Sequence, residues 1–206
     1  MDLLSETGGM RMRQTELKRK TAETEIVVRL SLDGSGIASV HTGIGFFDHM
    51  LLLLARHARL DLVVEAQGDL ATDDHHTAED VGIVLGQAIG RALGDKRGIQ
   101  RYGHAMVPMD EALASATIDL SGRAYLVFDA QFTADRIGDF STQMTEEFFR
   151  ALVFQAGMTA HLACVYGRND HHKTEALFKA FARSLRDAIC IDPRLEGEIL
   201  STKGVL

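Results

Sequence analysis

Two copies of one five-residue pattern carry the side chains best suited to chemistry. His75-His76-Thr77-Ala78-Glu79 and His171-His172-Lys173-Thr174-Glu175 start 96 residues apart, at positions 75 and 171. In an α-helix, residues four apart share a face while adjacent residues point in different directions, so each pattern offers ligands on two sides. Imidazole nitrogen and carboxylate oxygen together suit manganese, iron or zinc. The absence of Cys near either pattern argues against a thiolate site. The sequence therefore predicts a duplicated metal site in a duplicated domain.

The simpler interpretation is a pair of surface or core histidines. One isolated His-His pair on a helix usually binds no metal. Here, however, four of the nine His lie in two doublets in register. Each doublet follows an aspartate that can cap a helix, Asp74 or Asp170, and precedes an apolar helical pattern. We therefore predict that both patterns bind metal.

The elements that must position these helices also occur twice. The predicted order is strand, strand, buried helix, strand and His-His helix, with each pair of opening strands joined as a hairpin. The first copy is expected at residues 25–32, 36–40, 46–55, 60–65 and 75–92, and the second at 114–120, 123–128, 148–158, 159–166 and 171–188. The sequence thus predicts an α+β fold of two fused, internally duplicated β-β-α-β-α repeats, each with a sheet packed against helices.

The chain is expected to form one compact body. A flexible N-terminal extension is predicted at 1–18, the first repeat at 19–95, and the connector, second repeat and C-terminal loop at 96–206. No Pro-rich or low-complexity linker separates the repeats. Apolar residues surround much of each helix, which predicts burial between sheets or against other subunits and favours a homo-oligomer.

Composition excludes several classes of function. The 206 residues are 46% hydrophobic, enough for a sizeable core. A net charge of −7 offers no basic surface for nucleic acid. The longest apolar run, Met50 to Ala55, is far shorter than the roughly 20 residues that span a membrane. The first residues lack an apolar signal core, so the default expectation is a cytoplasmic protein. Cys164 and Cys190 have no motif partner and are expected to be reduced.

Five stretches, between about Arg19 and Lys203, resemble the imidazoleglycerol-phosphate dehydratase family. They are Arg19-x-Thr21-x-Glu23-Thr24, Gly45-Phe46-Phe47-Asp48-His49-Met50-Leu51, Asp74-His75-His76-Thr77-x-Glu79-Asp80, Asp119-Leu120-Ser121-Gly122-Arg123 and Gly167-Arg168-Asn169-x-His171-His172-x-x-Glu175-x-x-Phe178-Lys179. The resemblance implies Mn-dependent dehydration of D-erythro-imidazole glycerol phosphate to imidazole acetol phosphate in histidine biosynthesis. It also implies two Mn²⁺ per subunit and a homo-oligomer of 24 subunits built from trimers, with metal sites at subunit contacts.

The resemblance and the internal symmetry together imply a set of metal ligands. The expected ligands are His49, His75, His76, Glu79, Glu147, His171, His172 and Glu175. The i and i+4 pair of each pattern would share one metal, and the second His of the other repeat would complete each site. His49 is the expected buried-helix ligand in the first repeat. In the second, many family members carry His just before the Phe-Phe pair, where this chain has Glu147. Because carboxylates bind Mn²⁺ well, we expect Glu147 to coordinate directly or through water.

The implied reaction requires loss of a C–H proton that no ordinary side chain takes unaided. Lewis-acid withdrawal on both imidazole nitrogens would lower the pKa of the ring N–H, favour departure of the neighbouring hydroxyl and acidify the next C–H. A carboxylate then removes that proton. By its place in the family's early motif, Glu23 is the expected base, and Asp110 is a second acidic candidate. The expected catalytic set is Glu23, His75, His76, His171, His172 and Glu175.

A phosphate group on the substrate calls for cations, hydroxyls and backbone N–H donors. The resemblance implies Arg101, Arg123, Lys179, Ser201 and Lys203. Lys179 follows Glu175 by four residues, so we expect one surface to run from metal to phosphate. The segment 201–204 is typical of a loop that orders over a ligand.

Two other functions would also use paired His and carboxylates. A dinuclear metallohydrolase would cleave phosphate esters or amides with a metal-bound water. A metal-storage protein or metal-linked shell would bind many ions per subunit. The strand-rich repeats and the expected phosphate cations argue against storage, and dependence on an imidazole substrate distinguishes the dehydratase from the hydrolase.

Overall fold

The computed structural model describes residues 12–195 and 197–204. Its elements form two copies of one unit, followed by a 3-10 turn at Pro193–Leu195. The first copy contains β1 (Gln14–Lys20), β2 (Thr24–Ser31), β3 (Ala38–His41), α1 (Gly45–Ala58), β4 (Asp61–Gly68) and α2 (His75–Leu93). The second contains β5 (Tyr102–Met109), β6 (Ala112–Asp119), β7 (Tyr125–Asp129), the inserted hairpin of β8 (Arg136–Ile137) and β9 (Phe140–Ser141), α3 (Met144–Ala156), β10 (Thr159–Tyr166) and α4 (Asp170–Ile189).

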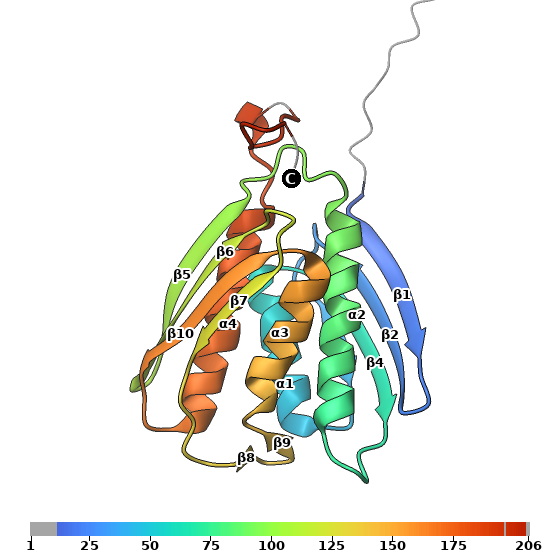
Figure 1. The fold of residues 1–206 in the computed structure, drawn as a ribbon, viewed down its shortest axis with the longest axis vertical. Coiled ribbons are helices and arrows are strands. Elements are labelled where there is room, and N and C mark those ends of the chain that lie inside the picture. Colours follow the sequence, from blue (N-terminus) through green and yellow to red (C-terminus); the bar gives the residue numbers. More distant parts are fainter. Residues whose placement is uncertain (1–11, 196, 205–206) are drawn as a thin grey trace, which may run out of the picture.

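The four helices lie between two four-stranded sheets (Figure 1). The sheets have the same order, β1-β2-β4-β3 and β5-β6-β10-β7, and in each only the last pair is parallel. Across the middle layer α1 packs against α4 and α2 against α3, so every helix contacts the other repeat. The predicted α+β class, the duplication and the burial of the helices are confirmed.

Each repeat begins with a strand that the sequence did not predict. β1 lies at the edge of its sheet, antiparallel to β2, so residues 14–18 of the predicted flexible extension are ordered. Its sequence, QTELKRK, contains a single apolar residue, Leu17. It therefore lacks the alternation of apolar and polar residues that indicates a strand. Residues 1–11 lie outside the described part of the chain. β5 occupies the same position in the second repeat, within the predicted connector.

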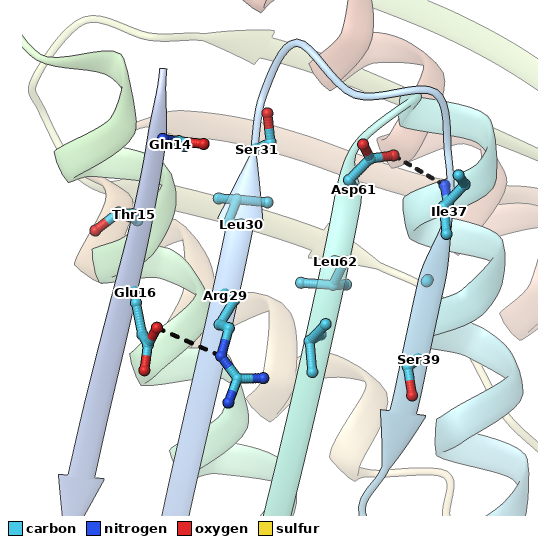
Figure 2. Close-up of a pocket in the computed structure, with 12 residues that line it drawn as sticks. Gln14, Thr15, Glu16, Arg29, Leu30, Ser31, Ile37, Ser39, Asp61 and Leu62 are labelled. Carbon is cyan, nitrogen blue, oxygen red and sulfur yellow. Dashed lines mark hydrogen bonds and ion pairs between the residues drawn. The ribbon is translucent and has the colours of Figure 1, made fainter. Parts of the chain in front are cut away.

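The predicted hairpins are wrong. β2 pairs with β1 and β4, whereas β3 crosses over to lie parallel to β4. A contact distant in sequence holds this crossover: the Asp61 carboxylate accepts hydrogen bonds from the backbone N–H groups of Ser35, Gly36 and Ile37 at 2.8, 3.2 and 3.0 Å. Figure 2 shows Asp61 at the start of β4, reaching the chain as it enters β3. In the second repeat β6 and β7 likewise flank β10.

A constant interval relates the buried helices of the two repeats. α1 ends at Arg59 and α3 at Gly157, both in the left-handed conformation, and the buried positions of α1 recur in α3 after the same 98 residues. His49 and Glu147 therefore occupy equivalent positions. The Phe-Phe pairs, which suggest a different alignment in the sequence, are four residues out of this register.

The core is centred on aromatic rings between the helices. Phe47 of α1 stacks on Phe140 of the inserted hairpin, with ring centroids 5.4 Å apart. Phe148 of α3 stacks on Phe178 of α4 at the same distance. The insertion between β7 and α3 is thus built into the core through a fully buried side chain.

The outer faces of the two sheets are open to solvent. A groove of about 680 Å³ crosses the first sheet, lined by β1, β2, β3 and β4 (Figure 2). The second sheet exposes Tyr102, Met106, Tyr125, Val127 and Val165. Exposed apolar surface of this kind is typical of protein–protein contacts. Among the described residues, no helix combines the length and apolar character needed to cross a membrane.

Candidate metal and substrate site

Three of the expected ligands meet where α4 begins, next to α1. The Glu175 Oε2 atom lies 3.3 Å from His171 Nε2 and 3.7 Å from His49 Nε2. One ligand atom from each residue lies within 4.8 Å of the others. Two imidazole nitrogens and one carboxylate oxygen at this spacing fit a divalent metal ion.

The Glu175 carboxyl is ionised despite its burial. Burial disfavours the charged form, but Lys179 donates a hydrogen bond from Nζ at 2.5 Å, and the net result is a lowered pKa for Glu175. An ionised carboxylate is the form that binds metal. Lys179 therefore contacts the cluster, and its expected role in phosphate binding stays a prediction.

The cluster crosses the two repeats, which corrects the expected grouping. His49 was assigned to the site of the first repeat, but α1 packs against α4, so His49 faces His171 and Glu175. Helix packing sets this partnership, and no local spacing in the sequence could reveal it.

The equivalent helices α2 and α3 carry the matching set. His75 Nε2 lies 3.9 Å from Glu79 Oε2. Glu147 stands on α3 at the position that corresponds to His49, but its Oε2 lies 3.4 Å from Arg150 Nε. Coordination by Glu147 stays a prediction.

The second histidine of the first pattern turns away from the first. The His75 and His76 rings are 6.2 Å apart with planes at 82°, as expected for neighbours on a helix. His76 Nδ1 lies 3.1 and 3.2 Å from the two carboxylate oxygens of Asp69, and this contact raises the pKa of His76. Glu23 Oε2, from the β1–β2 turn, lies 3.8 Å from the same nitrogen.

His172 has a similar environment in the second repeat. Its Nδ1 lies 2.7 Å from Glu111 Oε2, which raises the pKa of His172, and its Nε2 lies 3.6 Å from Asp110 Oδ2. The backbone N–H of Asn169, the His172 ring and the backbone N–H of Arg168 together lower the pKa of Glu111 to about 2. Each of these helices therefore presents its two histidines in different directions, as predicted.

The side chains that cap the first histidine of each pattern stand one residue before the predicted aspartates. The side chains of Asp73 and Asn169 accept the backbone N–H of the first His in each pattern, at 2.8 and 2.9 Å. Asp74 and Asp170 instead turn into the protein, where they are buried.

Both buried aspartates hold the segment inserted between β7 and α3. Asp74 accepts hydrogen bonds from the backbone N–H and hydroxyl of Ser141, at 2.5 and 2.7 Å. Asp170 accepts the backbone N–H of Thr133 at 2.8 Å and forms an ion pair with Lys173. The starts of α2 and α4 are thereby fixed to a common segment.

Four of the five expected phosphate-binding residues line one pocket of about 580 Å³. The pocket is formed by Arg101, Ser121, Gly122, Arg123, Ser201, Thr202 and Lys203. Arg101 donates to both Asp119 oxygens, at 2.7 and 3.1 Å, and to the Leu200 carbonyl at 2.6 Å. Arg101 thus anchors the C-terminal segment over a pocket whose remaining cations, Arg123 and Lys203, are exposed.

The pocket and the metal cluster lie at opposite ends of α4. The backbone N–H of Arg101 donates to the Ala188 carbonyl near the end of the helix at 2.9 Å, whereas His171 stands at its start. The helix rise places His171 and Ala188 about 25 Å apart. Lys179 lies between them, bonded to Glu175, and is absent from the pocket lining. The expected surface from metal to phosphate is therefore not formed within one chain.

Comparison with known proteins identifies the family of this chain. The family model described as imidazoleglycerol-phosphate dehydratase matches residues 42–185. An imidazoleglycerol-phosphate dehydratase from Streptococcus sanguinis is 57% identical over 195 residues, which cover 95% of this chain and 100% of the relative. The chain belongs to the imidazoleglycerol-phosphate dehydratase family.

Other members of the imidazoleglycerol-phosphate dehydratase family support the same assignment. A relative from Azorhizobium caulinodans is 58% identical, with 95% of this chain and 99% of the relative covered. The crystal structure from Staphylococcus aureus has a TM-score of 0.80 at 41% identity and covers 87% of this chain and 99% of its own. The structure from Pyrococcus furiosus, in complex with (S)-C348, has a TM-score of 0.78 at 34% identity and covers 92% and 100%. The resemblance seen in the sequence is confirmed, and the chain is a dehydratase.

Two acidic residues of the site were missed by the sequence analysis. Glu111 follows Glu23 by 88 residues, the interval that also separates β2 from β6. The spacing of the two predicted turns already contained this interval, so it could have identified Glu111. Asp69 gave no such signal, because the equivalent position in the second repeat is Gly167.

Proposed function

We propose that this chain dehydrates imidazole glycerol phosphate to imidazole acetol phosphate, a step of histidine biosynthesis, with two Mn²⁺ per subunit. The observation that carries the proposal is the cluster of His49, His171 and Glu175 in a member of this family. Those three residues would hold one ion. His75, Glu79 and Glu147, on the equivalent helices, would hold the other.

When bound, the metal ions would supply Lewis-acid withdrawal that lowers the pKa of the substrate's imidazole N–H. Glu23 would act as the base. It stands on an exposed turn with its carboxylate 3.8 Å from His76 Nδ1, within reach of a substrate held at that histidine. The hydroxyl next to the ring would leave as water with the proton lost from the ring N–H. Glu23 would then take the proton of the next C–H, a ring nitrogen would regain a proton, and the enol product would become the ketone. Asp110, beside His172, stays a second acidic candidate.

The substrate's phosphate would bind at Arg101, Arg123, Ser201 and Lys203. A substrate of one imidazole ring and a three-carbon chain cannot bridge about 25 Å along α4. The pocket that serves a given metal cluster would therefore come from another copy of the chain. This supports a homo-oligomer with sites at subunit contacts, which the family resemblance extends to 24 subunits built from trimers, and the open outer sheet faces offer contact surfaces.

Removal of the metal is expected to abolish turnover of imidazole glycerol phosphate, and added Mn²⁺ to restore it. The ligands come from helices that meet across the repeats, and the completed site needs a second chain, so particle size should recover with activity. The measurement is a turnover assay of chelator-treated protein before and after Mn²⁺, with light scattering alongside. Mn²⁺ uptake without turnover would favour storage, and cleavage of phosphate esters would favour a metallohydrolase.

Glu23→Gln is expected to lower kcat by about 10²–10⁴-fold, because the amide cannot accept the C–H proton. Mn²⁺ affinity should be unchanged, since Glu23 lies on an exposed turn and outside the expected ligand set. Steady-state kinetics and a calorimetric Mn²⁺ titration measure the two effects. Full turnover in the folded variant would exclude Glu23 as the base.

A further inference from the structure

The two repeats hold their second histidines with carboxylates from different places. In the second repeat, Glu111 on the β5–β6 turn contacts His172 Nδ1 at 2.7 Å. In the first repeat, the equivalent residue is Glu23, and it stays 3.8 Å from His76 Nδ1. Instead, the two carboxylate oxygens of Asp69, from the loop after β4, contact that nitrogen at 3.1 and 3.2 Å. The halves have therefore diverged at one specific contact.

These contacts fix which ring nitrogen is free. An ionised carboxylate can only accept hydrogen bonds, so the Nδ1 atoms of His76 and His172 must carry the proton. In the neutral ring the lone pair then lies on Nε2, the atom left to bind a metal. Histidines that bind metals commonly donate their other N–H to a carboxylate, which sets the ring orientation and raises its basicity.

Glu23 and Glu111, on the equivalent turns of the two repeats, also differ in how firmly their carboxylates are held. Glu111 accepts three hydrogen bonds, from His172 and from the backbone N–H groups of Arg168 and Asn169 at 3.0 and 2.7 Å. Within the described part of the chain, the Glu23 carboxylate accepts no hydrogen bond, and its side chain is 53% exposed against 28% for Glu111. Glu111 is held in place, whereas Glu23 can move.

We infer that Asp69 and Glu111 are positioning residues that present Nε2 of His76 and His172 to metal, and that Asp69 leaves Glu23 free for proton transfer. The inference rests on the proposed function and deepens it. It explains why only one of two equivalent glutamates serves as the base. Among the described residues, the only hydrogen-bond partner of the Asp69 side chain is His76, so Asp69 is the cleaner test of the two.

The test is a calorimetric Mn²⁺ titration of the metal-free full chain. Asp69→Ala is expected to weaken Mn²⁺ binding about 10–100-fold at one class of site, because His76 loses its oriented tautomer. Asp69→Asn keeps a carbonyl acceptor and should recover part of this loss. Asp95→Asn, which removes the same charge beyond the far end of α2, is the matched control and should bind as the native chain does.

The outcomes separate the inference from the proposed function. Native protein that binds no Mn²⁺ would overturn both. Native protein that binds Mn²⁺, together with an Asp69→Ala variant of equal affinity, would overturn the inference alone. Should Asp69→Ala fail to fold, as judged by circular dichroism, Asp69→Asn carries the test, with a several-fold loss expected. Glu23→Gln should keep native affinity, and a loss equal to that of Asp69→Ala would show that Glu23 holds His76 too.

Discussion

Mixed assemblies of two impaired variants, His171→Ala and Arg123→Ala, are expected to regain turnover that neither shows alone. His171 belongs to the proposed metal cluster and Arg123 to the proposed phosphate pocket, at opposite ends of α4. If each site joins the cluster of one chain to the pocket of another, an equal mixture contains some sites with both parts intact. Random assembly makes that fraction roughly one quarter.

The mixing experiment has a built-in control. His171→Ala and Glu175→Gln both damage the metal cluster, so their mixture should stay inactive at every ratio. Both mixtures are dissociated by metal removal, reassembled with Mn²⁺ and assayed at low substrate concentration against the mixing ratio. A curve that peaks at the equal mixture supports shared sites. No recovery with the first pair, despite full reassembly, would place cluster and pocket in separate functions.

Asp170→Ala is expected to lower the free energy of unfolding by about 3–5 kcal/mol. Asp170 and Lys173 are both buried, so removal of the carboxylate leaves the ammonium group without a counter-ion, bonded only to the Gln131 carbonyl at 2.7 Å. The backbone N–H groups of Thr133 and Ala134 also lose their acceptor. Urea unfolding of metal-free protein measures the change without a contribution from metal binding.

Control variants identify the cause of this loss. Asp95→Ala breaks an exposed pair with Arg97 and should change stability by at most about 1 kcal/mol. The double variant Asp170→Leu with Lys173→Met should recover much of the lost free energy of unfolding, because apolar replacement of a buried ion pair often leaves stability unchanged. An Asp170→Ala variant as stable as Asp95→Ala would contradict the role assigned to the ion pair.

The contribution of Asp170 also predicts a dependence on pH. Burial opposes its charge, but the Lys173 hydrogen bond and the backbone N–H groups of Ala134 and Thr133 lower its pKa from 3.8 to about 2. The unfolded chain therefore binds this proton more readily than the folded one. The stabilisation is complete above pH 3.8 and is lost as pH falls toward 2, so the stability difference between native and Asp170→Ala protein should shrink over that window.

The sequence predicted what depends on short-range spacing. Four helices followed from their apolar periods, and His171 and Glu175 meet because they stand four residues apart. The pairing of strands did not follow, because it depends on contacts distant in sequence, such as the hydrogen bond between Gly36 and Asp61, 25 residues apart. The place of His49 depends on how α1 packs on α4. The motifs identified the pocket residues, yet only the folded chain shows that they lie far from the metal cluster.

The inserted hairpin makes the two halves unequal partners. A duplicated chain of this kind resembles a dimer of identical units joined end to end, but only the second half contains the insertion. Asp74 of the first half accepts a hydrogen bond from Ser141 of the hairpin, and Asp170 of the second half accepts one from Thr133, which precedes the hairpin. A first half produced alone, even paired with a second copy of itself, would lack the Ser141 N–H and hydroxyl that donate hydrogen bonds to the Asp74 carboxylate. Dividing the chain between its repeats would therefore not give two equivalent, self-sufficient halves.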